Sequence, residues 1–223
     1  IKTFAVNTQQ YIINDITPFD LTTKVSEVQN AFNQLTYSHI PVTKDGVFEG
    51  AISENDIHCY DADKTLEAYQ YSLESFHVKQ QTNWIDILEA FALNNSTIMP
   101  VLTDNYKYLG YYELSDIMNI FNDTPFLGEA GGIIVIEKGT ADYSFSEICQ
   151  IVESNDAKIL GVFISKMEND ITQITVKVGH TGINAIVQTF RRYNYNVVSN
   201  HQEDRFIEDL KKRSQYLEKY LKM

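Results

Sequence analysis

The strongest constraint on this chain is an internal duplication. The segment "VSEVQNAFNQLTYSHIPV" at 25–42 aligns with "WIDILEAFALNNSTIMPV" at 84–101, and an Ala-Phe pair and a Pro-Val pair recur 59 residues apart. The Gly and the Asp of "GAISENDI" (50–57) recur at an offset of 60 in "GYYELSDI" (110–117). A repeat at a fixed interval indicates one structural unit used twice. We therefore expect two copies of a unit of about 60 residues.

Both copies predict the same succession of elements. Apolar residues recur at helical spacing across 25–35 and 84–91, which indicates an amphipathic helix at the start of each copy. Two short apolar runs follow, separated by a polar turn, and they predict two strands before a second helix. One such unit cannot cover both faces of its sheet, so we expect the two copies to pack together. The expected strands are 39–42, 47–52, 98–102 and 108–112.

Ser53 and Asp56 stand where the second strand of the first copy gives way to a helix. Ser-x-x-Asp at a helix start is close to a capping box, in which both side chains serve the helix's own N–H groups and the cap contributes about 1 kcal/mol. The same N–H groups also attract a phosphate, and a carboxylate one turn into the helix can accept hydrogen bonds from a vicinal diol. The residues alone leave capping and ligand binding both open.

The pattern of "IPV", a turn, Gly, two apolar residues and Ser-x-x-Asp, repeated in tandem, resembles a pair of CBS domains, the Bateman module. The resemblance covers about 11–122 and implies tandem CBS domains in 1–122, the first at about 11–62 and the second at about 70–122. It implies a pseudo-symmetric disc whose clefts bind an adenosine-containing ligand such as AMP, ADP, ATP or S-adenosylmethionine. Such a compound would be a regulatory ligand, and no cofactor is required.

In the first copy the resemblance gives each candidate residue a role. Ser53 would contact phosphate, Asp56 would hold the ribose hydroxyls, and His39 matches a basic position that reaches phosphate. Pro41 and Val42, the Pro-Val pair of the first strand, are included among the ligand-binding residues.

The second copy matches the same pattern less well. Asp116 keeps the ribose position, but Glu113 stands where the phosphate-contacting hydroxyl belongs, and a carboxylate there repels an anion. Ile98 at the basic position carries no charge. We therefore expect at most one competent site, built around Ser53 and Asp56.

The chain changes character after residue 122. The segment "NDTPFLGEAGG" contains one Pro and three Gly, so 123–132 is expected to be a linker. Residues 133–200 predict the order β-α-β-β-α-β, the ferredoxin-like split arrangement, and the fold class is therefore α+β with helices and strands mixed. The tail, 201–223, is helical in composition and predicts a C-terminal helix.

At this size and behind a CBS pair, residues 133–200 resemble an ACT domain, and the whole chain is similar to acetoin-utilisation-type CBS–ACT proteins. The resemblance implies that a domain that binds an amino acid carries an Asp and a Gly around the first strand–helix turn. Gly139 and Asp142 are present, but Ser144 rather than Gly precedes the helix. This departure favours a structural or dimerising domain over amino-acid binding.

Charge and motif content exclude several classes of protein. Residues 1–127 carry 17 acidic and 6 basic side chains, which makes a poor surface for nucleic acid. The five histidines are scattered and no hydrolase, P-loop or HExxH motif occurs, so we expect neither an enzyme nor a metal site. No apolar run reaches the roughly 18 residues of a membrane span, no signal peptide is visible, and the two cysteines match no metal spacing. We expect a cytoplasmic protein.

Three functions remain. The first is a non-catalytic regulatory protein that senses an adenosine-containing ligand in the first cleft and acts, as a homodimer, on a protein that the sequence does not name. The second is a CBS–ACT oligomerisation scaffold without its own ligand. The third is an amino-acid sensor that acts through the ACT-like domain.

Overall fold

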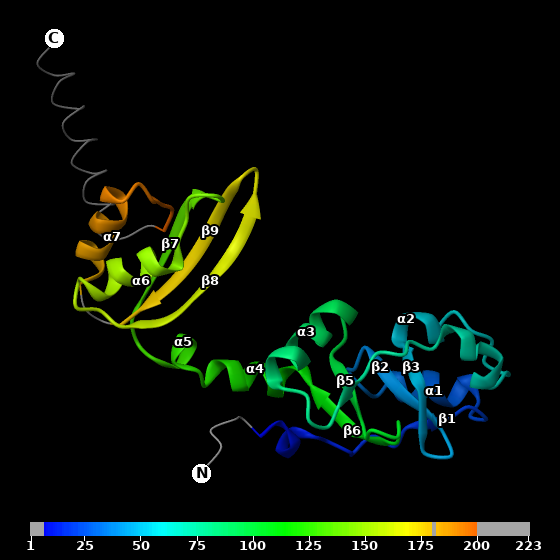
Figure 1. Ribbon diagram of the computed structural model, residues 1–223. Helices are drawn as coiled ribbons and strands as arrows, with labels where there is room; N and C mark the ends of the chain where they lie inside the picture. Colours follow the sequence, from blue (N-terminus) through cyan, green and yellow to red (C-terminus); the bar gives the residue numbers. More distant parts are fainter. Residues whose placement is uncertain (1–6, 180–181, 200–223) are drawn as a thin grey trace, which may run out of the picture. The chain divides into compact units, whose positions relative to one another are not determined.

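The computed structural model describes residues 7–179 and 182–199, and Figure 1 shows the path of the chain. The chain divides into two compact units, here called unit 1, which ends at Phe121, and unit 2, which begins at Asn122. Helices and small sheets are mixed in both units, so the predicted α+β class is confirmed. The predicted C-terminal helix, 201–223, lies outside the described residues.

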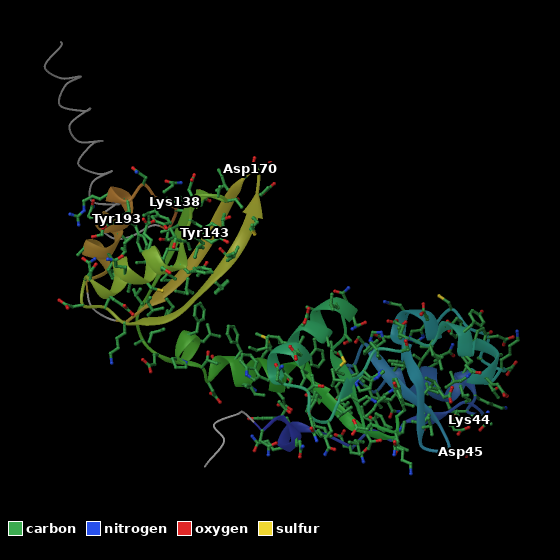
Figure 2. All side chains as sticks on the ribbon, in the orientation of Figure 1. Lys44, Asp45, Lys138, Tyr143, Asp170 and Tyr193 are labelled. Carbon is green, nitrogen blue, oxygen red and sulfur yellow. The ribbon has the colours of Figure 1, made fainter. Side chains whose placement is uncertain are left out.

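The first copy in unit 1 forms a three-stranded sheet. Strand β1 pairs in parallel with β2, and β2 forms an antiparallel hairpin with β3. Asp45 and Gly46 take positive φ angles of 52° and 77°, which closes the predicted turn; Lys44 and Asp45 mark it in Figure 2. The elements of this part are η1 (Thr8–Tyr11), β1 (Phe19–Asp20), α1 (Val25–Phe32), β2 (His39–Lys44), β3 (Val47–Ser53) and α2 (Glu54–Ile57).

The second copy repeats this arrangement. Strand β4 pairs in parallel with β5, and β5 forms an antiparallel hairpin with β6. Both hairpins shift register at corresponding points, between Val42 and Thr43 and between Val101 and Leu102. The elements of this part are η2 (Leu66–Ser72), β4 (Val78–Lys79), α3 (Trp84–Asn94), β5 (Ile98–Leu102), β6 (Tyr108–Glu113) and α4 (Leu114–Asn122).

Each copy has its own hydrophobic core, built from the periodic residues of its helices. In the first copy Val25, Val28 and Phe32 of α1 are at most 3% exposed and share one cluster with residues of β2 and β3. In the second copy Ile87 and Phe91 of α3 pack in the corresponding cluster. Burial of each such side chain contributes about 1.5–3 kcal/mol, which explains why the helical spacing of these residues predicted the elements.

A seam of reciprocal hydrogen bonds joins the two copies. The Ser38 amide donates to Thr97 Oγ1 at 2.9 Å, and the Thr97 amide donates to Ser38 Oγ at 2.9 Å. These residues are 59 positions apart, so the seam lies on an approximate two-fold axis that relates the copies. The turns between the hairpin strands also meet, where the Phe48 amide donates to the Tyr106 carbonyl at 3.1 Å.

A short segment before each copy crosses the second hairpin strand of a sheet. Ile13 exchanges two backbone hydrogen bonds with Tyr111 of β6, at 2.9 and 2.8 Å. Glu74 exchanges the corresponding pair with Ala51 of β3, at 2.8 and 2.9 Å. The sequence did not predict these crossings, because two isolated residues carry no periodic pattern.

The repeated glycines of the opening motif make room for these crossings. A Cβ atom on Gly110 would lie 2.3 Å from the carbonyl oxygen of Ile13. A Cβ atom on Gly50 would lie 2.7 Å from the Cβ atom of Leu73. Glycine at these two positions therefore allows the close backbone approach that brings each crossing segment onto its strand.

Unit 2 is one antiparallel sheet in the order β10-β7-β9-β8, with α6 and α7 on one face (Figure 1). The predicted β-α-β-β-α-β order is the one observed, and Asp170 marks the β8–β9 turn in Figure 2. Apolar residues of alternating strand positions pack against both helices to form the core. The elements are β7 (Gly132–Gly139), α6 (Phe145–Glu153), β8 (Ile159–Glu168), β9 (Ile171–Val178), α7 (Ile183–Arg192) and β10 (Asn196–Val197).

The segment predicted as a linker contains a helical turn. Helix α5 (Pro125–Gly128) begins with Pro at its first position and places Phe126 on the ring of Phe163, with centroids 5.4 Å apart. Phe126 also covers Gly161, where a Cβ atom would lie 2.4 Å from its ring. The contact between Phe126 and Phe163 holds this segment against β8.

Candidate functional site

The first hollow, as we name it, encloses about 340 Å³ at the end of the β2–β3 hairpin. Strand β2, strand β3 and helix α2 of the first copy supply most of its wall, and the crossing segment supplies Glu74. The second copy closes it with Asn94 and Asn95 at the end of α3. The lining residues are Ser38, His39, Ser53, Glu54, Asn55, Asp56, Glu74, Asn94 and Asn95. Three of the predicted site residues, His39, Ser53 and Asp56, are thus brought together.

His39 is held in the wall of the first hollow by polar partners on both ring nitrogens. Its Nδ1 atom lies 2.8 Å from Ser38 Oγ, and its Nε2 atom lies 3.2 Å from Glu74 Oε1. The ring also packs edge-on against Phe76, with centroids 5.0 Å apart. His39 is only 6% exposed, so these contacts fix the orientation of its ring.

Ser53 caps helix α2. Its Oγ atom accepts a hydrogen bond from the Asp56 amide at 3.1 Å, and its φ and ψ angles of −81° and 149° are those of a cap residue. The capping interpretation is therefore correct for the Ser53 side chain. The Asp56 side chain remains at the wall of the first hollow, where its carboxylate can accept hydrogen bonds from a bound hydroxyl group.

The second hollow encloses about 370 Å³ at the corresponding place in the other copy. It is lined by Thr36, Tyr37, Thr97, Glu113, Leu114, Ser115 and Met118. Here a chain of hydrogen bonds runs across the seam: Tyr37 donates to Glu113 Oε1 at 2.5 Å, and its hydroxyl lies 3.3 Å from that of Tyr111. Ser115 donates to the other oxygen of Glu113 at 3.1 Å, so both carboxylate oxygens have partners within the protein.

Corresponding positions explain why the hollows differ. Ala51 stands where Tyr111 stands in the second copy, and Ser96 stands where Tyr37 stands in the first. The centroids of the Tyr37 and Tyr111 rings lie 5.7 Å apart, and Tyr37 lines the second hollow, whereas the small residues Ser96 and Ala51 do not line the first. The Ser96 hydroxyl is buried, and no partner for it exists among the residues that the structure describes.

Tyr37 of the first copy and two tyrosines of the second copy are held in their neutral form. Burial, together with the hydrogen bond to Asp15, raises the pKa of Tyr111 well above its usual value. The hydrogen bond to Glu113 raises the pKa of Tyr37, and burial raises that of Tyr108. At neutral pH the Tyr37 hydroxyl donates to Glu113 and the Tyr111 hydroxyl to Asp15, whereas the Tyr108 hydroxyl is buried with no partner among the described residues.

Three predicted site residues lie elsewhere. The side chain of Val42 belongs to the hydrophobic core of the first copy, and Pro41 is buried outside the lining of the first hollow. Every residue of β2 from His39 to Thr43 is buried, so strand alternation could not tell which side chains face the hollow. Asp116 of α4 is not among the lining residues of the second hollow.

Sequence reasoning missed Glu74, Asn94 and Asn95 as wall residues. Glu74 reaches the first hollow only because its segment crosses β3, and the two asparagines belong to the other copy. Asn95 ends α3 with a positive φ of 48°. An Asn-Asn pair at the end of a helical pattern indicates such a cap, which was the one available signal.

Unit 2 has its own hollow, which encloses about 600 Å³ beside the turn after β7. Its wall carries charges of both signs, from Lys138 and from the carboxylates of Glu137 and Asp142. The Lys138 ammonium group also lies 2.8 Å from Glu147 Oε2, and this contact lowers the pKa of Glu147. Lys138 and Tyr143 are labelled near this turn in Figure 2.

Within 7–179 and 182–199, no group of three or more His, Cys, Asp or Glu side chains is placed to hold a metal ion. Among the helices of this described part, none is long and apolar enough to span a membrane.

No protein-family model matches the chain, and no curated protein does either. Solved structures with a similar fold include a CBS domain pair/ACT domain protein from Thermotoga maritima, with 20% identity over 52% of this chain and 96% of that chain and a TM-score of 0.48. The CBS domains of a transcriptional regulator from Streptococcus pneumoniae match with 17% identity over 51% and 98%, and a TM-score of 0.46. The protein CBSX2 in complex with AMP matches with 14% identity over 52% and 95%, and a TM-score of 0.44. These distant similarities assign no ligand and no partner to this chain.

Proposed function

We propose that this chain is a non-catalytic regulatory protein that binds an adenosine-containing ligand, such as AMP, ADP, ATP or S-adenosylmethionine, in the first hollow. The observation that carries the proposal is the meeting of His39, Ser53 and Asp56 around one space of about 340 Å³. The pattern of the sequence singled out these residues, and they come from two strands and a helix.

The two-copy wall of the first hollow supports a regulatory role. Because Asn94 and Asn95 of the second copy face the α2 end of the first, a bound ligand contacts both copies. Binding would therefore favour one relative arrangement of the copies over another, and a ligand shifts such an equilibrium only through this difference in affinity. In the second hollow, Tyr37 and Glu113 already satisfy each other, so we propose one ligand per chain.

We further propose that the protein acts in the cytoplasm as a homodimer. The two cysteines, Cys59 and Cys149, are free thiols, as is usual in a reducing compartment. On the sheet face of unit 2 opposite its helices, Ile133 and Phe163 remain 46% and 45% exposed. A second copy would cover this face, and a scaffold without its own ligand would use the same surface.

A second candidate is amino-acid binding in unit 2. The observation that favours it is the hollow beside Gly139, which has Lys138 on its wall together with Glu137 and Asp142. Groups of both signs suit the ammonium and carboxylate groups of a free amino acid. Single amino acids therefore belong in the same binding screen.

The test is a thermal-shift screen of the full chain with adenosine, AMP, ADP, ATP, S-adenosylmethionine and single amino acids. A ligand at 100 times its dissociation constant stabilises the folded state by about 2.7 kcal/mol. We expect Asp56→Ala to abolish the shift and the corresponding change Asp116→Ala to preserve it. The absence of a shift with every adenosine compound overturns the proposal, and a shift that survives Asp56→Ala places the ligand elsewhere.

A further inference from the structure

The first hollow is strongly acidic for a site that would hold a phosphate. Three carboxylates, those of Glu54, Asp56 and Glu74, lie in its wall. Among the described residues, His39 is the only basic side chain that lines it, and no lysine or arginine does. A phosphate group in this space would therefore meet more like charge than opposite charge.

The single basic group is already engaged. Glu74 Oε1 lies 3.2 Å from His39 Nε2, and Ser38 Oγ lies 2.8 Å from His39 Nδ1. An incoming phosphate must either displace the Glu74 carboxylate from His39 or sit beside it. The first choice breaks the contact between Glu74 and His39 while the charge of Glu74 stays nearby, and the second places two anions close together.

The backbone of Glu74 is held at the edge of the first hollow, and its carboxylate reaches His39 from there. Two hydrogen bonds with Ala51, at 2.8 and 2.9 Å, fix the residue on β3. Leu73 packs so closely over Gly50 that a Cβ atom there would lie 2.7 Å from the Leu73 Cβ atom. The segment cannot withdraw from the first hollow without breaking these contacts, so Glu74 is a built-in part of the wall.

Helix α2 does little to offset these charges. It has only four residues, and Glu54 and Asp56 lie in its first turn. The Glu54 amide already donates to the Ser38 carbonyl at 2.9 Å, and the Asp56 amide donates to Ser53 Oγ at 3.1 Å. The N–H groups of these two residues are thus already used within the protein.

We infer that the first hollow selects an adenosine-type nucleoside without a phosphate group and that Glu74 is the residue that excludes nucleotides. The inference rests on the proposed function and sharpens it. The Asp56 carboxylate accepts hydrogen bonds from the ribose diol, and the asparagine amides of the second copy supply neutral donors and acceptors. Nothing in this arrangement requires a negative charge on the ligand.

The first test compares adenosine, AMP and ATP by titration calorimetry on the full chain. We expect adenosine to bind tightest and AMP to bind about ten-fold more weakly, with ATP weaker still, because each added charge meets the carboxylates. Raising the salt concentration should narrow the difference, since salt screens repulsion. A genuine phosphate site would behave in the opposite way, and AMP would lose affinity in salt.

The second test removes the charge of Glu74. Glu74→Gln should improve AMP binding relative to adenosine by about five-fold. The matched control is Glu67→Gln, which removes one negative charge from an exposed position of η2 outside the first hollow and should leave the ratio unchanged. Should Glu74→Gln fail to fold, the ligand series and the salt dependence of the unmodified chain decide the matter.

The outcomes separate the two claims. If ATP or AMP binds more tightly than adenosine to the unmodified chain, or if Glu74→Gln folds and leaves the ratio unchanged, the exclusion of phosphate is overturned and the proposed function stands. If neither the unmodified chain nor Glu74→Gln binds any adenosine compound, the proposed function is overturned and the inference with it.

Discussion

The two hollows of unit 1 occupy corresponding places in two copies of one unit and have similar volumes, about 340 and 370 Å³, yet their walls differ in chemistry: the first carries three carboxylates and a histidine, and the second carries a tyrosine hydrogen-bonded to a glutamate. The backbone is shared, since both hairpins have the same pairing and the same register shift. Four pairs of side chains make the difference. They are Ala51 and Tyr111, Ser96 and Tyr37, Ser53 and Glu113, and His39 and Ile98. A duplicated backbone thus provides two similar spaces, and a few substitutions decide the chemistry of each wall.

The largest expected effect on stability is at the two glycines where a segment crosses a strand. Gly110→Ala should lower the free energy of unfolding by about 3 kcal/mol or more, because the new Cβ atom meets a backbone oxygen at 2.3 Å. Gly50→Ala should cost less, about 2 kcal/mol, since its Cβ atom meets the Leu73 side chain at 2.7 Å. Urea denaturation of both variants measures the difference, and equal costs would contradict it.

Alkaline pH should test the buried tyrosines of the second copy. Tyr111 and Tyr108 have pKa values raised by burial, whereas tyrosines in the unfolded chain ionise near pH 10. Their contribution to stability is therefore complete below about pH 10 and is lost as the pH rises above it, at about 1.4 kcal/mol per unit for each tyrosine that stays protonated. Urea denaturation at about pH 9 and at about pH 11 measures this loss of stability. Tyr111→Phe should reduce the slope, and an unchanged slope would exclude Tyr111 as its source.

The hydrogen-bond chain at the second hollow is the next test. Tyr111→Phe should cost about 2 kcal/mol at neutral pH, because it removes the hydroxyl that donates to Asp15 and lies beside that of Tyr37. Tyr71→Phe is the matched control, since Tyr71 is 84% exposed and its hydroxyl should contribute almost nothing. Thermal denaturation of both variants provides the measurement. If both variants lose equally little stability, the hydrogen bonds of Tyr111 do not stabilise the protein.

The smallest expected effect concerns the helix cap of the first copy. Ser53→Ala should cost about 1 kcal/mol, because the Asp56 amide loses its acceptor. Ser115 lies at the start of α4 and is exposed. Ser115→Ala should therefore cost about 0.5 kcal/mol or less, as most surface substitutions do. If the two variants lose equal stability, Ser53 is not acting as a cap.

Local periodicity predicted most of the fold. The helical spacing of α1 and α3, the strand bounds of β5, and the β-α-β-β-α-β order of unit 2 all follow from repeated short-range patterns. The register of the duplication also located Ser53 at a helix start, where its cap is observed.

Long-range placement could not be predicted in the same way. Glu74 is a wall residue because two backbone hydrogen bonds bring its segment onto β3, and no pattern within the segment marks this. Tyr37 precedes β2 of the first copy, but its hydroxyl serves the second hollow. Val42 was expected at the site, but its side chain lies in the core. Strand β2 is buried on both faces, so the sequence does not show which of its side chains face the hollow.

The seam between Ser38 and Thr97 makes the two copies depend on each other. Because each hollow has wall residues from both copies, a substitution in one copy can change the hollow that corresponds to the other. Tyr37 is encoded in the first copy, but the hollow that it lines corresponds to the second. The two copies are therefore not independent modules. A chimera that exchanged only one of them for a homologous copy would alter both hollows at once.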